Sequence, residues 1–371
     1  MPDPVLWSLD AHTRAKHQVL AAYLAAWIPV MGQQALKVAG LSREPPRLLV
    51  VDGFAGPGRY DKGEEGSPLI MLRSLLDHRS FSVLSRVQFI YLFIEQDARR
   101  FAYLKDQVND LALPSNVDVR MEHGAFEDSF GTLVAAAKGA NKVLIPTFAF
   151  IDPFGYSTAS MSLAGKFLDF PRSEALFFLP LSYIHRFVGR AGQEDALTNL
   201  FNTDRWREAI PLNGDERRAF LLDLFEEQLR RQGQVRHVTS FALRTSDGND
   251  YRLVFATGHP RGLELMKNAM WSVDSVRGTS YVAHTETGQQ VLFQTNVDTR
   301  PLLDELRRAF GKKWFCVPDA CAAMLTTPYL PERHLKKLTL KPAGKEGILV
   351  VERPEGKRAG TFTDDVRMKF V

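Results

Sequence analysis

The sequence predicts an α/β fold: a Rossmann-like, mostly parallel sheet closed by an antiparallel hairpin, with a smaller domain after it. Near-continuous apolar runs alternate with helical segments up to about residue 230, which is typical of parallel strands buried on both faces. Residues 235–258 form two strand-like runs around the turn sequence TSDGND, a strong hairpin signal. Short helical segments and a two-strand ribbon follow, in the order of a winged helix. We therefore expect domains at residues 1–298 and 299–371.

The individual elements follow from local patterns of apolar residues and breakers. Ser67 is expected to cap a helix and Pro68 to occupy its first turn. Strands are expected at residues 47–52, 87–95, 117–121, 142–152, 174–181, 235–244 and 251–258, with a strand-like stretch at 281–294. Helices are expected at residues 13–27, 67–78, 98–111, 159–170, 215–232, 260–271, 301–310, 318–327 and 331–340.

Composition limits the class of protein. The chain has 371 residues, of which 45% are hydrophobic and 24% charged, so it is globular and not disordered. Cys316 and Cys321 stand alone, which supports neither a disulfide framework nor a zinc ribbon. No uninterrupted apolar stretch approaches the roughly 18 to 20 residues of a membrane span. We expect a cytoplasmic protein with no membrane association and no metal, whose net charge of +4 permits a polyanionic partner.

The sequence DGFAGPGRY, residues 52–60, follows the first predicted strand and is a candidate cofactor turn. Its glycines, Gly53, Gly56 and Gly58, would let the backbone approach a ligand at the edge of the sheet. The dehydrogenase fingerprint fails because its third glycine would fall at Asp61, and the phosphate-binding P-loop fails because no Lys-Ser or Lys-Thr follows. The spacing matches the acid-x-x-x-G-x-G turn that binds S-adenosyl-L-methionine (AdoMet). A tight turn without a ligand is the alternative.

Two further segments fit the same cofactor. Glu95 ends the second strand, where a carboxylate can accept hydrogen bonds from both hydroxyls of a ribose. The segment GAFED, residues 124–128, follows the third strand and would place Ala125 and Phe126 against an adenine. A solvated acid and an ordinary loop are the alternatives for these segments.

The fourth strand ends in the sequence Asp152-Pro153-Phe154-Gly155-Tyr156. Enzymes that methylate an exocyclic amine carry D/N-P-P-Y/F/W there, where the acid holds the amino group and an aromatic ring stacks on the base. Asp152 would hold the amine, with Pro153 beside it and Phe154 or Tyr156 as the stacking ring. A turn capped by Asp152 is the alternative.

The chain resembles the three-Cys-motif partner protein family, TcmP. This resemblance implies a class I AdoMet-methyltransferase-like fold and a partner protein with a three-cysteine, radical-AdoMet-like motif. The blocks that carry it span nearly the whole chain: HTRAKHQVLAAYLAAW, VDGFAGPGRY, EGSPLIMLRSL, FIEQDARRFAYL, FAFIDPFGYS, GLELMKNAMW and GTFTDDVRMKF.

More distantly, the chain is similar to the bacterial 23S ribosomal RNA adenine-N6 methyltransferase that acts as a monomer. That family also combines an early Lys-His pair, an AGxGRY turn and a later Asp-Pro tetrad. The resemblance implies that Asp152 contacts the acceptor amine, while Phe154 and Gly155 depart from the tetrad and leave methyl transfer open. It implies that Lys16 and His17 lie near the cofactor or the target, that Asp52, Gly56 and Gly58 lie at the methionine end, and that Glu95 contacts the ribose. The other residues of the turn expected to contact the cofactor are Gly53, Phe54 and Ala55. A helix start on the protein surface is the alternative for Lys16 and His17.

Two functions from different classes remain. The first is an AdoMet-dependent methyltransferase that acts on nucleic acid, at an exocyclic amino nitrogen of the adenine N6 type. The second is a non-catalytic AdoMet-fold module that binds nucleic acid or the three-Cys partner. A metal-dependent nuclease that uses Asp152 and Glu95 ranks lower, because no third ligand stands at recognisable spacing. The residues expected to contact phosphates are Lys336, Lys337, Lys341, Lys345, Lys357 and Arg358.

Overall fold

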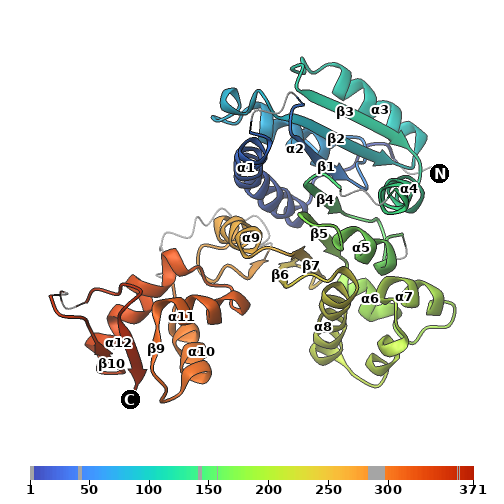
Figure 1. Cartoon of the computed structure of the whole chain (residues 1–371). Coiled ribbons are helices and arrows are strands. Elements are labelled where there is room, and N and C mark those ends of the chain that lie inside the picture. Colours follow the sequence, from blue (N-terminus) through green and yellow to red (C-terminus); the bar gives the residue numbers. More distant parts are fainter. Residues whose placement is uncertain are drawn as a thin grey trace. The chain divides into compact units, whose positions relative to one another are not determined.

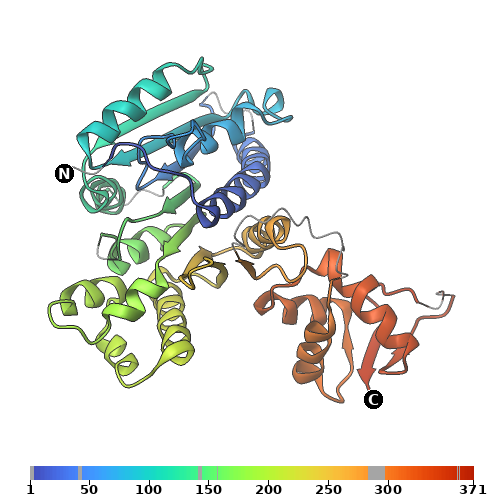
Figure 2. The ribbon, with the colours of Figure 1, turned by 180° about the vertical axis from the view of Figure 1, so that it is seen from behind.

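The protein is described by a computed structural model, shown from two sides in Figures 1 and 2, over residues 4–40, 44–140, 144–156, 158–282, 297–356, 358 and 360–371. The chain forms two compact units. Unit 1 comprises Met1–Ala269 with Tyr281–Thr285, and unit 2 comprises Met270–Ser280 with Glu286–Val371. Residues 270–280 fall in unit 2 because the Trp271 ring packs beside His334, with ring centres 4.3 Å apart. The domain boundary at residues 298 and 299 stays a prediction.

Unit 1 contains the large, mostly parallel sheet that the sequence predicts, in the order β3-β2-β1-β4-β5-β7-β6-β8. Strands β1 to β5 are parallel to one another, and β7 runs antiparallel to both β5 and β6. At the β6-β7 turn Gly248 has φ +85°, a left-handed conformation that suits glycine. The strands are β1 (Arg47–Asp52), β2 (Gln88–Glu95), β3 (Val117–His123), β4 (Thr147–Ile151), β5 (Ser173–Leu179), β6 (His237–Arg244), β7 (Asp250–Thr257) and β8 (Ser280–Val282).

Helices cover both faces of this sheet (Figure 1). Helices α1 and α2 contact β1 and each other, whereas α4, α5 and α8 share a hydrophobic core with Leu49 and Val51 on the opposite face. The helices of this part of the chain are α1 (Ala11–Ala39), α2 (Ser67–Leu76), α3 (Ala98–Asn109), α4 (Phe126–Gly139), α5 (Met161–Leu168), α6 (Leu181–Phe187), α7 (Glu194–Phe201), α8 (Gly214–Gly233) and α9 (Pro260–Val273), with 3-10 turns η1 (Ser82–Leu84) and η2 (Asp204–Ala209).

Several boundaries differ from the predicted ones. Helix α1 begins at Ala11 and continues through Pro29 to Ala39. Gly66 rather than Ser67 occupies the N-cap position of α2, where no side chain caps the helix, and the Ser67 side chain hydrogen-bonds to Asp52 instead. The segment after β3 is not an ordinary loop, since α4 begins within it at Phe126. Strand β8 covers only the start of the predicted stretch, and residues 283–294 lie outside the described residues.

Helix α1 is fixed to the sheet by one buried carboxylate. Tyr23 Oη and Trp27 Nε1 donate to Glu174 Oε2 at 2.7 and 2.6 Å, and Thr257 Oγ1 donates to Oε1 at 2.5 Å. Burial raises the pKa of Glu174. In the described part of the chain α1 alone is long and apolar enough to cross a membrane, yet its side chains at Val19 and Leu20 are fully buried in the fold. These hydrogen bonds hold the middle of α1 against β5.

Unit 2 combines short helices with a three-stranded antiparallel sheet of order β10-β11-β9. The short strand β9 lies between the first two helices, where the sequence analysis expects none. It forms because Phe315 pairs with Met368 of β11 and both side chains are buried. The elements are α10 (Arg300–Phe310), β9 (Phe315–Cys316), α11 (Val317–Ala323), η3 (Met324–Thr326), the π-helix η4 (Pro331–Leu340), α12 (Lys341–Lys345), β10 (Leu349–Glu352) and β11 (Arg367–Phe370).

Candidate active site

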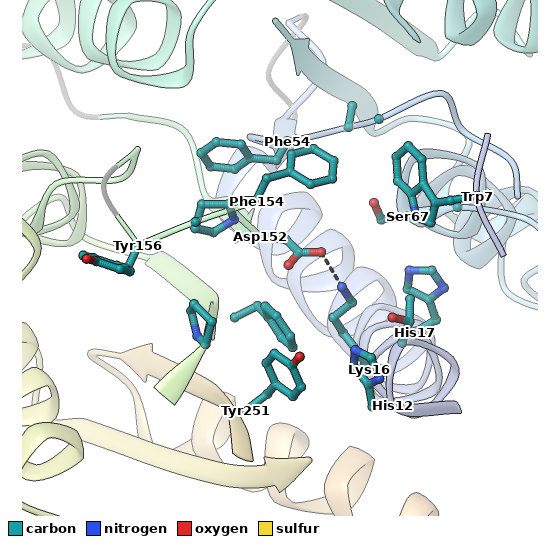
Figure 3. A pocket seen from close by; sticks show the side chains of 18 of the residues that line it. Trp7, His12, Lys16, His17, Phe54, Ser67, Asp152, Phe154, Tyr156 and Tyr251 are labelled. Atoms are coloured by element: carbon teal, nitrogen blue, oxygen red, sulfur yellow. Dashed lines mark hydrogen bonds and ion pairs between the residues drawn. The ribbon is translucent and has the colours of Figure 1, made fainter. Parts of the chain in front are cut away.

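Two cavities adjoin at the carboxyl ends of the parallel strands, the edge where open α/β sheets bind ligands. The Asp152 cavity, of about 550 Å³, lies between the end of β4, the glycine turn after β1 and the start of α1 (Figure 3). The Glu95 cavity, of about 370 Å³, lies at the end of β2. Phe54 and Phe154 line both cavities, so the two spaces meet at these rings.

The structure brings most of the predicted site residues to these cavities. Asp52 and Ala125 line neither one. The Glu95 cavity is lined by the predicted residues Gly53, Phe54, Glu95, Phe126 and Phe154. The Asp152 cavity is lined by the predicted residues Lys16, His17, Phe54, Ala55, Gly56, Gly58, Asp152, Pro153, Phe154 and Tyr156.

Glu95 holds the glycine turn in place. Its Oε2 accepts a hydrogen bond from the Gly56 amide at 2.8 Å, and its Oε1 accepts one from the Asp97 amide at 2.7 Å. Gly56 and Gly58 have φ +62° and +80°, conformations that non-glycine residues rarely adopt. Each carboxylate oxygen has a second lone pair. Glu95 can therefore accept further donors on its cavity side while it supports the turn.

Asp52 lies beneath the turn rather than in a cavity. The side chain is fully buried, and its Oδ1 accepts the Phe54 amide at 3.2 Å. Burial raises the pKa of Asp52 to about 7, although the hydrogen bond from Ser67 opposes this shift. Within the described residues Asp52 Oδ2 has no hydrogen-bond partner. The carboxyl group thus links β1, the glycine turn and α2, and it supports the turn from below.

Lys16 of α1 points to Asp152 at the end of β4 (Figure 3). Lys16 Nζ lies 2.5 Å from Asp152 Oδ2, and the two side chains are only 7% and 19% exposed. The ammonium group also lies 4.4 Å from the centre of the Phe178 ring. A pair this close and this buried fixes the Asp152 carboxylate through Oδ2, and its Oδ1 can accept a hydrogen bond from an incoming donor.

His17, the next residue of α1, is 7% exposed and lies beside the Tyr60 ring. Burial, together with the smaller effect of the Lys16 charge, lowers the pKa of His17 to about 3. His17 is therefore neutral at physiological pH. It can offer one donor and one acceptor to a ligand without adding a charge to the cavity.

Aromatic rings form two walls of the Asp152 cavity. On one side Trp7 meets Phe154 edge to face at 5.6 Å, and the Arg100 guanidinium lies 4.8 and 5.0 Å from the two ring centres. Phe154 is 66% exposed. Tyr156, in contrast, is 8% exposed, and its hydroxyl donates to Gln193. Of the two predicted stacking residues, Phe154 is the one with an accessible ring.

The second wall consists of residues that the sequence analysis did not identify. The His12 and Tyr251 rings stack at 4.8 Å, and Tyr251 stacks on Phe178 at 5.1 Å. These rings come from α1, β5 and β7, and Tyr251 is the second residue of the strand after the DGND turn. That position is its only sequence signal. Arg100 lies in the block FIEQDARRFAYL but was given no role there, and Trp7 belongs to none of the quoted motifs.

The predicted phosphate-binding side chains lie in unit 2. Lys336 is 3.9 Å from Asp364 Oδ1, a pair too exposed to be strong. Lys357 lies outside the described residues. The exposed members of the predicted set are Lys336, Lys337, Lys341, Lys345 and Arg358. Over the described ranges, no group of three or more His, Cys, Asp or Glu side chains could hold a metal ion.

Comparisons with known proteins give the following results. No family model matches the sequence, and no curated protein matches it. Among solved structures, the chain is similar to an O-methyltransferase from Bacillus cereus in complex with SAH, at 14% identity and TM-score 0.32, over 64% of this chain and 80% of that one. It is also similar to the N-terminal domain of human METTL16 in complex with SAH, at 14% identity and TM-score 0.30, over 63% of this chain and 68% of that one. A third match is a human methyltransferase 10 domain containing protein, at 14% identity and TM-score 0.29, over 64% of this chain and 82% of that one.

Proposed function

We propose that this protein is an AdoMet-dependent methyltransferase that acts on nucleic acid, at an exocyclic amino nitrogen of the adenine N6 type. One observation carries the proposal: a cavity that contains Glu95 and a cavity that contains Asp152 meet at Phe54 and Phe154. A cofactor and an acceptor could thus occupy adjacent spaces. The sheet order, with β7 antiparallel beside β5, also supports a class I methyltransferase fold.

The residues of the Glu95 cavity fit the adenosine part of AdoMet. Glu95 has lone pairs left for two ribose hydroxyls, and Gly124 and Phe126 form the apolar side where an adenine ring would pack. Gly56 and Gly58, which have positive φ, line the adjoining Asp152 cavity together with Lys16 and His17, where the methionine part of AdoMet would lie. AdoMet, when bound, supplies an electrophilic methyl group on a sulfonium.

The residues around Asp152 would position the acceptor. Asp152 Oδ1 accepts a hydrogen bond from the amino group, which orients the nitrogen lone pair. Lys16 holds the carboxylate in place through the ion pair with Oδ2, so that its oxygens face the acceptor as hydrogen-bond acceptors. The exposed Phe154 ring supplies a stacking face for a flat base. Most of the effect is therefore positioning rather than acid-base chemistry.

The proposal also covers the role of unit 2, a partner protein and the location of the protein in the cell. Unit 2 has a helix, a short strand, two further helical segments and a two-strand ribbon, which supports a winged-helix-like domain that holds nucleic acid through its exposed lysines. The resemblance to the TcmP family supports a three-Cys-motif radical-AdoMet-like partner. We propose a cytoplasmic location, since α1, the apolar helix of unit 1, is packed in the fold.

Transfer of a labelled methyl group from AdoMet to total RNA and DNA, with and without the partner, tests the proposal. We expect label in nucleic acid with the wild type and a loss of at least 100-fold in Asp152→Ala, in line with the loss of a positioning group. Because Asp152→Ala leaves the Lys16 charge buried and unpaired, the double variant Lys16→Met/Asp152→Ala serves as the better-folded control. Equal label in wild type and both variants would remove Asp152 from the mechanism.

Calorimetry separates cofactor binding from transfer. Gly56→Asp places a side chain on a residue with φ +62° that lines the Asp152 cavity, so we expect it to abolish AdoMet binding. Gly63→Asp is the matched control, because Gly63 has φ +88°, lines neither cavity and has open space around it. Binding that survives Gly56→Asp contradicts the cofactor site. AdoMet binding without transfer supports the alternative, a non-catalytic module.

A further inference from the structure

A cluster of aromatic and basic side chains on unit 2 lies outside every site described above. We call it the Trp314 patch, and it comprises Lys312, Lys313, Trp314, Arg367 and Lys369. Lys312, Lys313 and Arg367 are exposed, while Trp314 and Lys369 are half-buried. These residues belong to the turn before β9 and to β11, whereas the predicted lysines of η4 and α12 are Lys336, Lys337, Lys341 and Lys345.

The register of the small sheet explains the cluster. Phe315 of β9 pairs with Met368 of β11, and both side chains are buried in the core of unit 2. Side chains alternate along a strand, so the residues on either side of this pair face outward. Trp314, Arg367 and Lys369 accordingly meet on the outer surface. The Arg367 guanidinium and the Lys369 ammonium each lie 5.2 Å from the centre of the Trp314 ring.

The patch has an excess of positive charge. It holds four cationic side chains, and the one carboxylate paired with any of them among the described residues is Glu352, 3.8 Å from Arg367. Both members of that pair are more than half exposed, so solvent screens their attraction. Lys312 and Lys313 extend the positive surface beside the indole. The charge is thus available to an anionic partner.

We propose that the Trp314 patch binds single-stranded nucleic acid, with an unpaired base stacked on the Trp314 indole and backbone phosphates held by Arg367 and Lys369. Sequence-tolerant single-strand binders combine aromatic platforms with cations in this way. A duplex keeps its bases paired and offers phosphates alone, so it would use only half of the patch. The proposal goes beyond methyl transfer, since it holds whether or not the Asp152 cavity is catalytic.

Fluorescence anisotropy of a labelled oligouridylate, titrated with the full chain at several salt concentrations, tests the proposal. We expect Trp314→Ala to weaken binding about 5- to 150-fold, the effect of losing one base stack. We expect Arg367→Gln/Lys369→Gln to weaken binding and to reduce the salt slope by about 1.4, because two phosphate contacts are lost. Trp314→Phe keeps a stacking ring and should retain most of the affinity, which separates stacking from misfolding.

The matched control is Arg300→Gln/Arg308→Gln, which removes the same charge from α10 at two exposed positions. We expect it to keep affinity and salt slope close to the wild type. Equal losses in the two double variants would mean that binding follows net charge, and this would overturn the proposal. Wild-type affinity in a folded Trp314→Ala protein, or equal affinity for single strand and matched duplex, would overturn it as well. None of these readouts depends on AdoMet.

Discussion

Replacing His17 by leucine should make the protein less sensitive to acid. Burial lowers the pKa of this imidazole from 6.5 to about 3 in the folded state. In the unfolded chain a histidine at pH 5 is about 97% protonated, whereas the folded state keeps His17 neutral. Because the folded pKa lies below the unfolded one, His17 contributes stability above pH 6.5 that is lost as the pH falls toward 3. Between pH 8 and pH 5 the loss amounts to about 2 kcal/mol.

Urea denaturation at pH 8, 7, 6 and 5 measures this contribution. The wild type loses stability through many groups, including His334, whose pKa burial lowers to about 4. Those groups are common to the wild type and His17→Leu, so the difference between the two pH profiles isolates His17. We expect the variant to lose about 2 kcal/mol less than the wild type between pH 8 and pH 5. Unfolding should be followed by the fluorescence of the tyrosines and tryptophans of unit 1, because unit 1 contains His17.

His123→Leu, at an exposed position of β3, serves as the control for exchanging a histidine for leucine. The histidine ring protons in NMR spectra give an independent readout, since the His17 signal should not titrate down to pH 5. Parallel pH profiles for wild type and His17→Leu, together with a His17 signal that titrates near pH 6, would refute a buried neutral imidazole.

Three further predictions concern the framework of the site. Glu174→Gln should lower the free energy of unfolding by about 1–3 kcal/mol, as measured by chemical denaturation. The reason is that the amide NH2 group of glutamine cannot accept a hydrogen bond from a buried donor, as the carboxylate oxygen in its place does. Gly58→Ala should cost more stability than Gly63→Ala, since both have positive φ but only at Gly58 does a Cβ meet a neighbour at 2.8 Å; equal melting temperatures would contradict this. Lys16→Met should lower the free energy of unfolding by about 3–5 kcal/mol, because it leaves the Asp152 carboxylate buried without its partner. The double variant Lys16→Met/Asp152→Ala should recover part of this loss. If denaturant unfolding shows that the losses of the two single variants simply add in the double variant, the two residues are not coupled.

Local signals account for the parts of the site that the sequence analysis located. The glycines of residues 52–60 and the acids Glu95 and Asp152 follow apolar strands, and the carboxyl ends of parallel strands meet at one edge. The sequence gives these acids different expected roles, but it does not show which of them reach a cavity. Asp52 is enclosed under the turn, and Glu95 supports the turn while it lines a cavity. Burial and hydrogen bonding decide between such roles, and both depend on contacts distant in the chain.

By itself the sequence determined the α/β class, the parallel strands and the closing hairpin, because these follow from periodicity and turn chemistry within short segments. The tertiary structure alone decided which side chains face the cavities. Lys16 reaches Asp152 across 136 positions of sequence, and Tyr251 joins His12 only after β7 has paired beside β5. Helix α1 takes its place through hydrogen bonds to Glu174, and no local pattern encodes such a contact.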